Sequence, residues 1–147
     1  MPPTEEDVRE MIALLDRYRY EIEMFTQQLG LLTTTESELA AAWDFLGSFD
    51  EVKEGDDILV PVGGGVLISA TVTDPEKVIA SIGMDIQAEM DPEAAAERIG
   101  ERRDRIREMI QQVRAGIEQR EASSTALQQQ AEAAYMELQN ARGAPTI

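Results

Sequence analysis

Apolar residues recur with a seven-residue period over the first third of the chain. With Val8 as heptad position a, eleven of the twelve a and d positions up to Leu46 are apolar, and Glu36 is the exception. Six heptads exceed the three or four that indicate a coiled coil. The pattern predicts a helix over residues 5–49. Thr4 followed three residues later by Asp7 is typical of its N-terminal cap.

A second heptad stripe occupies the last third of the chain and predicts a helix over residues 92–142. Asp91-Pro92-Glu93 is a typical helix start, because aspartate caps, proline fits the first turn and glutamate favours the positive end of the helix dipole. Ten of the thirteen a and d positions from Ile99 to Ala141 are apolar. Gly143 and Pro145 indicate the helix end.

The two stripes are most economically buried if the helices fold back on each other as an antiparallel pair. Three polar residues interrupt the second stripe, namely Arg103, Arg120 and Ser124. An antiparallel pairing would bring Glu36 near Arg103 or Arg120, so we interpret Glu36 as half of a structural charge pair. Trp43, at the last a position of the first helix, is expected to be a core residue.

Between the helices, residues 56–90 change to a β pattern. Two apolar runs flank Gly63-Gly64-Gly65, and two more flank Gly83, which predicts two β-hairpins. Pro61 favours an edge strand or a bulge. Four strands of about five residues leave apolar faces and edges uncovered, so we expect assembly through them. The expected oligomerisation residues are Ile58, Val60, Val62, Val66, Ile68, Val72, Ile79 and Ile82.

The composition narrows the classes of function. The absence of histidine and cysteine removes disulfides, thiolate and imidazole metal sites, and the usual nucleophilic triads, so we expect no enzyme, no cofactor and no metal. A net charge of −16 disfavours nucleic-acid binding, and it fits either a solvated helical surface or a salty cytoplasm. The chain has no apolar run long enough for a membrane span and no signal-like start, so we expect a cytoplasmic location.

The order of parts resembles the alpha subunits of the archaeal prefoldin family. The resemblance covers about residues 5–143, and its specific part is the hairpin block, with Ile58–Val66 followed by Asp74–Gly83. Two hairpins favour alpha, because the family's beta subunit has one. The family fold is α+β, a long antiparallel two-helix coiled coil with two central β-hairpins that assemble into an oligomeric β-barrel platform. We expect residues 1–147 to form one such subunit.

The resemblance implies a chaperone subunit in a hexamer of two alpha and four beta subunits. Such a hexamer holds unfolded polypeptides at its coiled-coil tips without nucleotide and passes them to a group II chaperonin. Opening of the helix pair near its ends would expose apolar seam residues. The expected client-binding residues are Val8, Met11, Ile12, Leu15, Leu127, Tyr135, Met136 and Leu138, and Leu14 lies beside them. Two alternatives stay open: these residues only pack the coil, or the chain is a scaffolding coiled-coil oligomer without chaperone activity.

Overall fold

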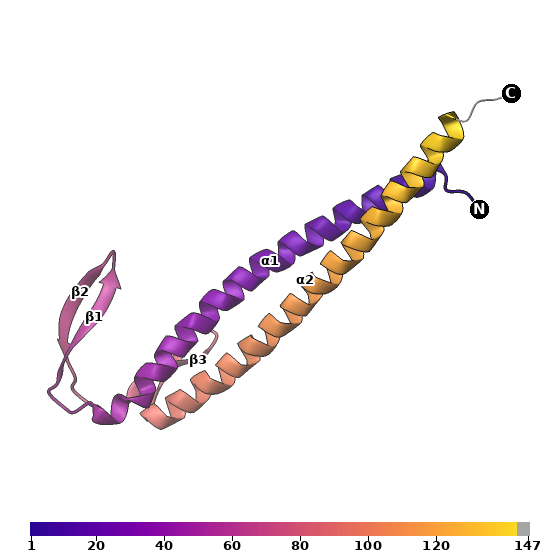
Figure 1. The fold of residues 1–147 in the computed structure, drawn as a ribbon. Coiled ribbons are helices and arrows are strands. Elements are labelled where there is room, and N and C mark those ends of the chain that lie inside the picture. Colours follow the sequence, from indigo (N-terminus) through magenta and orange to yellow (C-terminus); the bar gives the residue numbers. More distant parts are fainter. Residues whose placement is uncertain (144–147) are drawn as a thin grey trace. The chain divides into compact units, whose positions relative to one another are not determined.

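The computed structural model describes residues 1–143, which form two long helices, a short 3₁₀ helix and four strands (Figure 1). In chain order these are α1 (Glu5–Gly47), the 3₁₀ helix η1 (Phe49–Glu51), β1 (Asp57–Gly63), β2 (Val66–Thr71), β3 (Val78–Gly83), β4 (Ile86–Met90) and α2 (Pro92–Gly143). The expected α+β architecture of two long helices and two hairpins is confirmed. The first helix ends at Gly47, two residues before the expected boundary. Pro145, expected to help end α2, lies outside the described residues.

The chain divides into two compact units, each of which is built from both helices. Unit 1 contains Met1–Thr33 and the segment from Glu108 onward, and unit 2 contains Thr34–Arg107, including both hairpins.

Side-chain caps fix the start of each helix at the position that the sequence predicts. At α1, the Asp7 backbone N–H donates to Thr4 Oγ1 at 3.1 Å, and the Thr4 N–H donates to Asp7 Oδ2 at 2.7 Å. At α2, the Ala94 N–H donates to Asp91 Oδ1 at 2.7 Å. These bonds satisfy backbone donors that have no partner within the helix.

The core is a narrow seam between the helices of each unit. Eight of its ten buried apolar residues occupy heptad a and d positions, the exceptions being Phe49 and Ala95 of unit 2, and none of the described large side chains is completely enclosed. In unit 1 the buried apolar residues are Val8, Leu15, Leu32, Ile110, Val113, Ala131 and Ala134, and in unit 2 they are Leu39, Phe49 and Ala95. The buried a and d residues therefore form a stripe along each helix and not a globular interior, as knobs-into-holes packing requires.

Trp43 departs from its predicted place in the core. Its side chain is 45% exposed, although its heptad position faces α2. The residue opposite is Gly100, and a Cβ there would lie 3.3 Å from Trp43 Nε1. The indole therefore lies over the glycine backbone and keeps one side in solvent, because its ring is too large to fit between two closely packed helices.

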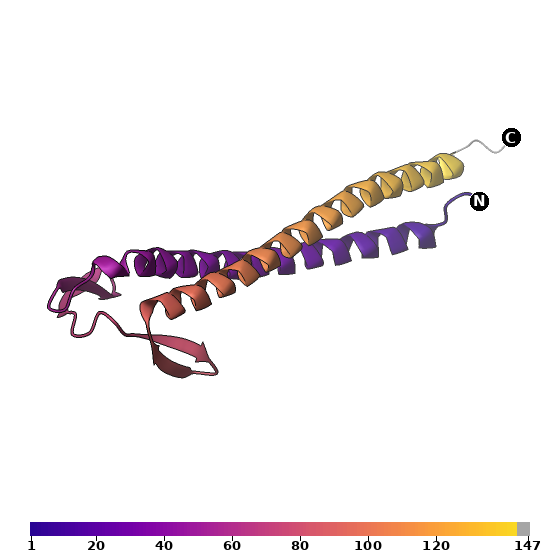
Figure 2. The ribbon, with the colours of Figure 1, turned by 90° about the horizontal axis from the view of Figure 1, so that it is seen from below.

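The strands form two separate antiparallel hairpins, β1–β2 and β3–β4, which appear as separate ribbons in Figure 2. In the first hairpin Ile58 is opposite Ala70 and Val60 is opposite Ile68, and a bulge follows Pro61 as predicted. In the second, Val78 is opposite Met90 and a bulge follows Ser81. Within residues 1–143 each sheet consists of only two strands, so the outer edge of each strand is unpaired.

The two hairpins turn with the same backbone geometry but different residues. In the first, Gly63, Gly64 and Gly65 all have positive φ angles. In the second, Gly83 is followed by Met84 and Asp85 with φ angles of 50° and 61°. Two successive left-handed residues match the strand twist of a two-residue hairpin. Methionine rarely adopts this conformation, so Met84, with its side chain fully in solvent, adds strain of about 1 kcal/mol or more.

Leu31 and Leu32 provide a matched test of the seam, because they are adjacent leucines with 74% and 9% exposure. Leu32→Ala should lower the free energy of unfolding by about 2–5 kcal/mol, since it leaves a cavity between the helices. Leu31→Ala should change it by no more than about 0.5 kcal/mol. Urea unfolding followed by circular dichroism measures both. Equal losses from the two variants would contradict the assigned heptad register.

Candidate functional site

The beginning of α1 and the end of α2 lie together in unit 1. The Glu5 carboxylate forms an ion pair with the Arg142 guanidinium, which joins the first turn of one helix to the last turn of the other. Figures 1 and 2 both show the N-terminal and C-terminal ends of the helices at this end of the unit. Client-binding residues predicted from both ends of the sequence are therefore brought into one region, which we call the coil end.

The eight residues predicted for client binding divide into two groups at the coil end. Val8 and Leu15 are buried, and Met11, Leu127 and Leu138 are half-buried. These five occupy seam positions and pack the coil in the closed structure. Ile12, Tyr135 and Met136 lie outside the seam and are 51%, 53% and 63% exposed. The prediction that an opened coil would present the seam residues stays a prediction, whereas these three are accessible without opening.

Two grooves run along the coil end, and both have apolar walls. The first lies between the helices and includes Met11, Leu14, Leu127 and Ala134. The second includes Val8, Tyr135 and Leu138. The first groove also involves Met1-Pro2-Pro3 and Ala133, which the sequence analysis did not single out. No heptad rule could have found them, because the first three residues precede the helix and Ala133 lies outside the seam.

Charged residues interrupt the seam at two levels, once in each unit. In unit 2 the Arg103 Nε donates to Glu36 Oε1 at 2.8 Å, and Arg107 Nε donates to the same oxygen at 3.2 Å. The predicted pairing of Glu36 with Arg103 is confirmed, with both side chains about one-fifth exposed. Arg120, the other predicted partner, belongs to unit 1 and binds a different carboxylate.

That second carboxylate is Glu21, whose Oε2 accepts from Arg120 Nε at 2.7 Å. Its Oε1 accepts from Arg17 Nε at 3.1 Å, one turn earlier on α1. The Arg120 guanidinium also lies 4.6 Å from the centre of the Phe25 ring and donates to the Gly116 carbonyl oxygen at 3.2 Å. A partly buried arginine is favoured when its donors have partners, and here the carboxylate and the carbonyl oxygen accept from it while the ring lies against it.

These contacts lower the pKa values of three carboxyl groups. The hydrogen bond from Arg103 is the main cause for Glu36, and the hydrogen bond from Arg120 is the main cause for Glu21, so the pKa of each falls below its usual value near 4.5. The backbone N–H of Thr4 lowers the pKa of Asp7 in the same way. All three carboxylates are structural, because each is engaged with helix ends or helix partners.

The residues predicted for oligomerisation differ in exposure: Val62, Val66, Ile68, Ile79 and Ile82 are exposed, whereas Ile58, Val60 and Val72 are half-buried. Ile58, Val60 and Ile68 share one face of the first hairpin, and Ile68 is 50% exposed. The bulge places Val62 and Val66 beside the turn, where both are more than half exposed. Val72 lies one residue beyond β2, although its N–H and carbonyl still bond to Asp56 and Gly55. This hairpin alone cannot bury these side chains.

The second hairpin distributes its predicted residues differently. Ile79 is opposite Glu89 and shares a face with Ser81 and Gln87, whereas Val78 and Ala80 face the other way. Ile82 lies in the bulge and is 44% exposed. Ile79 and Ile82 therefore do not form one continuous patch, which the alternation of side chains along a strand already indicates for residues three apart.

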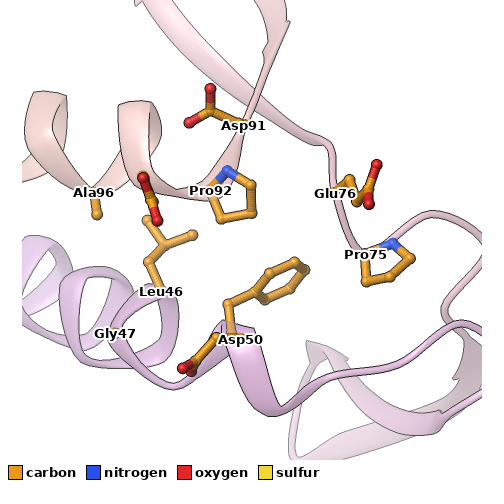
Figure 3. Close-up of a pocket in the computed structure, with 10 residues that line it drawn as sticks. Leu46, Gly47, Asp50, Pro75, Glu76, Asp91, Pro92 and Ala96 are labelled. Carbon is orange, nitrogen blue, oxygen red and sulfur yellow. The ribbon is translucent and has the colours of Figure 1, made fainter.

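A hollow in unit 2 marks the joint between the helix ends and the hairpins (Figure 3). Its apolar wall consists of Leu46, Pro75, Pro92 and the buried Phe49. The Phe49 ring meets the Phe45 ring edge to face, with 5.6 Å between centroids. Carboxylate side chains also line the hollow. One of them, Asp91, accepts the hydrogen bond that caps α2. We interpret this joint as the structural base from which the hairpins extend.

A two-helix coiled coil with β-hairpins inserted between its helices defines the class of protein. The family model described as "Prefoldin subunit" matches residues 18–137, and the chain belongs to the prefoldin family. The expected likeness to archaeal alpha subunits is also confirmed. As a member of this family the chain is a chaperone subunit, and the family is not one of enzymes.

Individual relatives support this assignment over most of the chain. It is 33% identical to the prefoldin subunit alpha of Methanoculleus marisnigri, over 88% of each chain. It is 32% identical to that of Methanospirillum hungatei, over 74% of this chain and 70% of the relative. A filamentous PFD from Methanocaldococcus jannaschii, solved by cryo-EM, matches with a TM-score of 0.65 and 26% identity, over 77% of this chain and 93% of that one. No helix within residues 1–143 is long and apolar enough to cross a membrane.

The seam carboxylates predict a stability that depends on pH. Because the folded pKa values of Glu21 and Glu36 lie below the unfolded value near 4.5, their contribution is fully present above that value. It is lost as the pH falls through the lower folded values. The melting temperature should therefore decrease between about pH 5 and pH 3.

Glu36→Gln should lower the melting temperature at pH 7 and flatten its dependence on pH over the same range. Thermal unfolding followed by circular dichroism measures both effects. Glu38→Gln, an exposed residue two positions away, is the matched control and should behave like the unchanged chain. If the Glu36 variant kept the full dependence on pH, the ion pair with Arg103 would not contribute to it.

Proposed function

We propose that this chain is the alpha subunit of a holdase that captures unfolded polypeptides at its coil ends without ATP and delivers them to a group II chaperonin. The observation that carries this proposal is the exposed apolar surface at the coil end, formed by Ile12, Leu14, Tyr135 and Met136. Membership of the prefoldin family supports it. The proposed site of action is the cytoplasm.

The chemistry of the coil end suits weak binding to many clients. Burying about 400 Å² of apolar surface contributes on the order of 10 kcal/mol before the costs of ordering, which remove much of it. Several such ends acting on one client would hold it, while each single contact remains reversible. Met11 and Met136 are flexible and polarisable, so they adapt to side chains of different shape. Opening of the coil would add Val8, Leu15, Leu127 and Leu138 to this surface.

Assembly through the hairpins would bring several coil ends to one client. The exposed apolar side chains and the unpaired strand edges of both hairpins favour strand pairing with other subunits. We propose prefoldin beta subunits as these partners, in a hexamer of two alpha and four beta subunits. The filamentous PFD of Methanocaldococcus jannaschii, to which this chain is similar, supports assembly into an oligomer.

The first experiment tests capture directly. The native complex is purified with this chain, and a chemically denatured model protein is diluted into it while light scattering is followed. Near-stoichiometric complex should suppress aggregation without ATP, and a complex lacking residues 1–15 and 128–147 of this chain should suppress it less. Retained oligomer mass is the control. A scaffolding protein would leave the aggregation curve unchanged in low and high salt.

The second experiment tests assembly. Val60→Asp places a charge on the apolar face of the first hairpin, opposite Ile68, and should release the subunit from its complex because an unpaired charge cannot be buried there. Native mass spectrometry measures the loss. Thr73→Asp, at an exposed position between the two hairpins, is the control and should leave the mass unchanged. An intact complex containing the Val60 variant would contradict assembly through this face.

A further inference from the structure

Unit 1 has a second exposed apolar surface, which is separate from the coil end. It consists of Tyr20, Met24 and Leu31, which are 64%, 47% and 74% exposed, and we call it the outer stripe. These residues occupy heptad positions f and c, on the side of α1 that faces away from the seam. Packing of the two helices therefore does not explain why they are apolar.

The outer stripe borders a groove whose floor is held in place by the Arg120 contacts. Phe25 and Arg120 line this groove together with Tyr20, Met24 and Leu31. The guanidinium stacks on the Phe25 ring and bonds to Glu21 and to the Gly116 carbonyl oxygen. A Cβ at position 116 would lie 3.6 Å from the ring, so glycine leaves the ring and the arginine ample room. A floor fixed in this way loses little further entropy when a ligand is bound.

The sequence around the outer stripe lacks the charges that cover most of the molecule. Residues 24–35 contain no Asp, Glu, Lys or Arg, although twelve residues at the 29% charge content of the chain would carry about three. Gln27 and Gln28, which also line the groove, can exchange neutral hydrogen bonds with a peptide backbone. Glu21 and Arg120, the two charged residues of the groove, are ion-paired with each other, so the surface is suited to an apolar peptide.

The size of the outer stripe distinguishes between possible occupants. Three partly exposed side chains present at most a few hundred Å², whereas each partner of a stable complex buries about 800 Å². A permanently docked subunit needs more surface than this groove offers. A short extended segment with one or two large apolar side chains fits it.

We propose that the outer stripe is a second contact site for non-native polypeptides, which holds an apolar segment of a client already bound at the coil end. This inference rests on the proposed holdase function and adds a location to it. A client held at two points on one coil dissociates more slowly than a client held at one, because both contacts must break together.

Photo-crosslinking in the native complex tests the location. A photo-reactive phenylalanine analogue replaces Met24, Met109 or Ile12 of this chain, one at a time, and a chemically denatured, fluorescently labelled model protein is added. Met109 is a matched control, since it is 42% exposed and does not line the groove. The label should be crosslinked several-fold more at position 24 than at position 109. Crosslinks from position 24 to another subunit, or equal yields at 24 and 109, overturn the proposal.

A pair of variants tests the energetic contribution. Met24→Ser combined with Leu31→Ser should weaken client affinity about tenfold, a loss consistent with removing two partly buried apolar contacts. Met109→Ser should leave the affinity unchanged, and both complexes should keep the native mass. Unchanged affinity of the double variant overturns the outer stripe alone, provided that position 12 still crosslinks the client. A complex that neither binds nor crosslinks the client anywhere overturns the holdase function as well.

Discussion

The apolar seam between α1 and α2 is the constraint on which the other features depend. A two-helix coil has only one stripe per helix to bury, so each a and d residue must face the partner and little else is enclosed. Burial of Leu32 and Val113 in unit 1, and of Leu39 in unit 2, follows from this geometry. Most apolar residues outside the stripe remain in solvent, including Ile12, Met24 and Met136. A coil thus leaves apolar residues exposed that a globular protein would enclose.

Charge pairs interrupt the seam and specify how the helices are paired. Glu36 with Arg103, and Glu21 with Arg120, replace apolar contacts by hydrogen-bonded ion pairs that only the correct register satisfies. A slip of one turn would leave a carboxylate or a guanidinium partly buried without its partner, which is unfavourable. The pairs therefore act mainly against misalignment, and Arg120 also fixes Phe25 below the outer stripe.

The hairpins differ from the seam, because part of their apolar surface is not covered by the chain itself. Each has two strands, free edges and apolar side chains that its own residues do not cover. The two turns share one backbone geometry, achieved with glycines in the first and with strain at Met84 in the second. The seam is buried within the chain, whereas the hairpins leave apolar side chains and strand edges uncovered. This division agrees with a chaperone subunit that combines a stable coil with surfaces for assembly and for binding.

The sequence by itself determined the helices, their caps and the two hairpins, because period, capping residues and turn glycines are local signals. It left an edge strand or a bulge open at Pro61, and Arg103 or Arg120 open as the partner of Glu36, and the tertiary structure selected the bulge and Arg103. Only the tertiary structure decided which apolar residues stay exposed. Trp43 is partly exposed although it occupies an a position, and Val60 is half-buried whereas Leu59 is exposed. The predicted client-binding residues likewise divided into buried and exposed groups, since burial depends on the partner helix. The outer stripe was visible in the sequence only as an uncharged segment, because hydrophobicity indicates that a residue can be buried but not what it contacts.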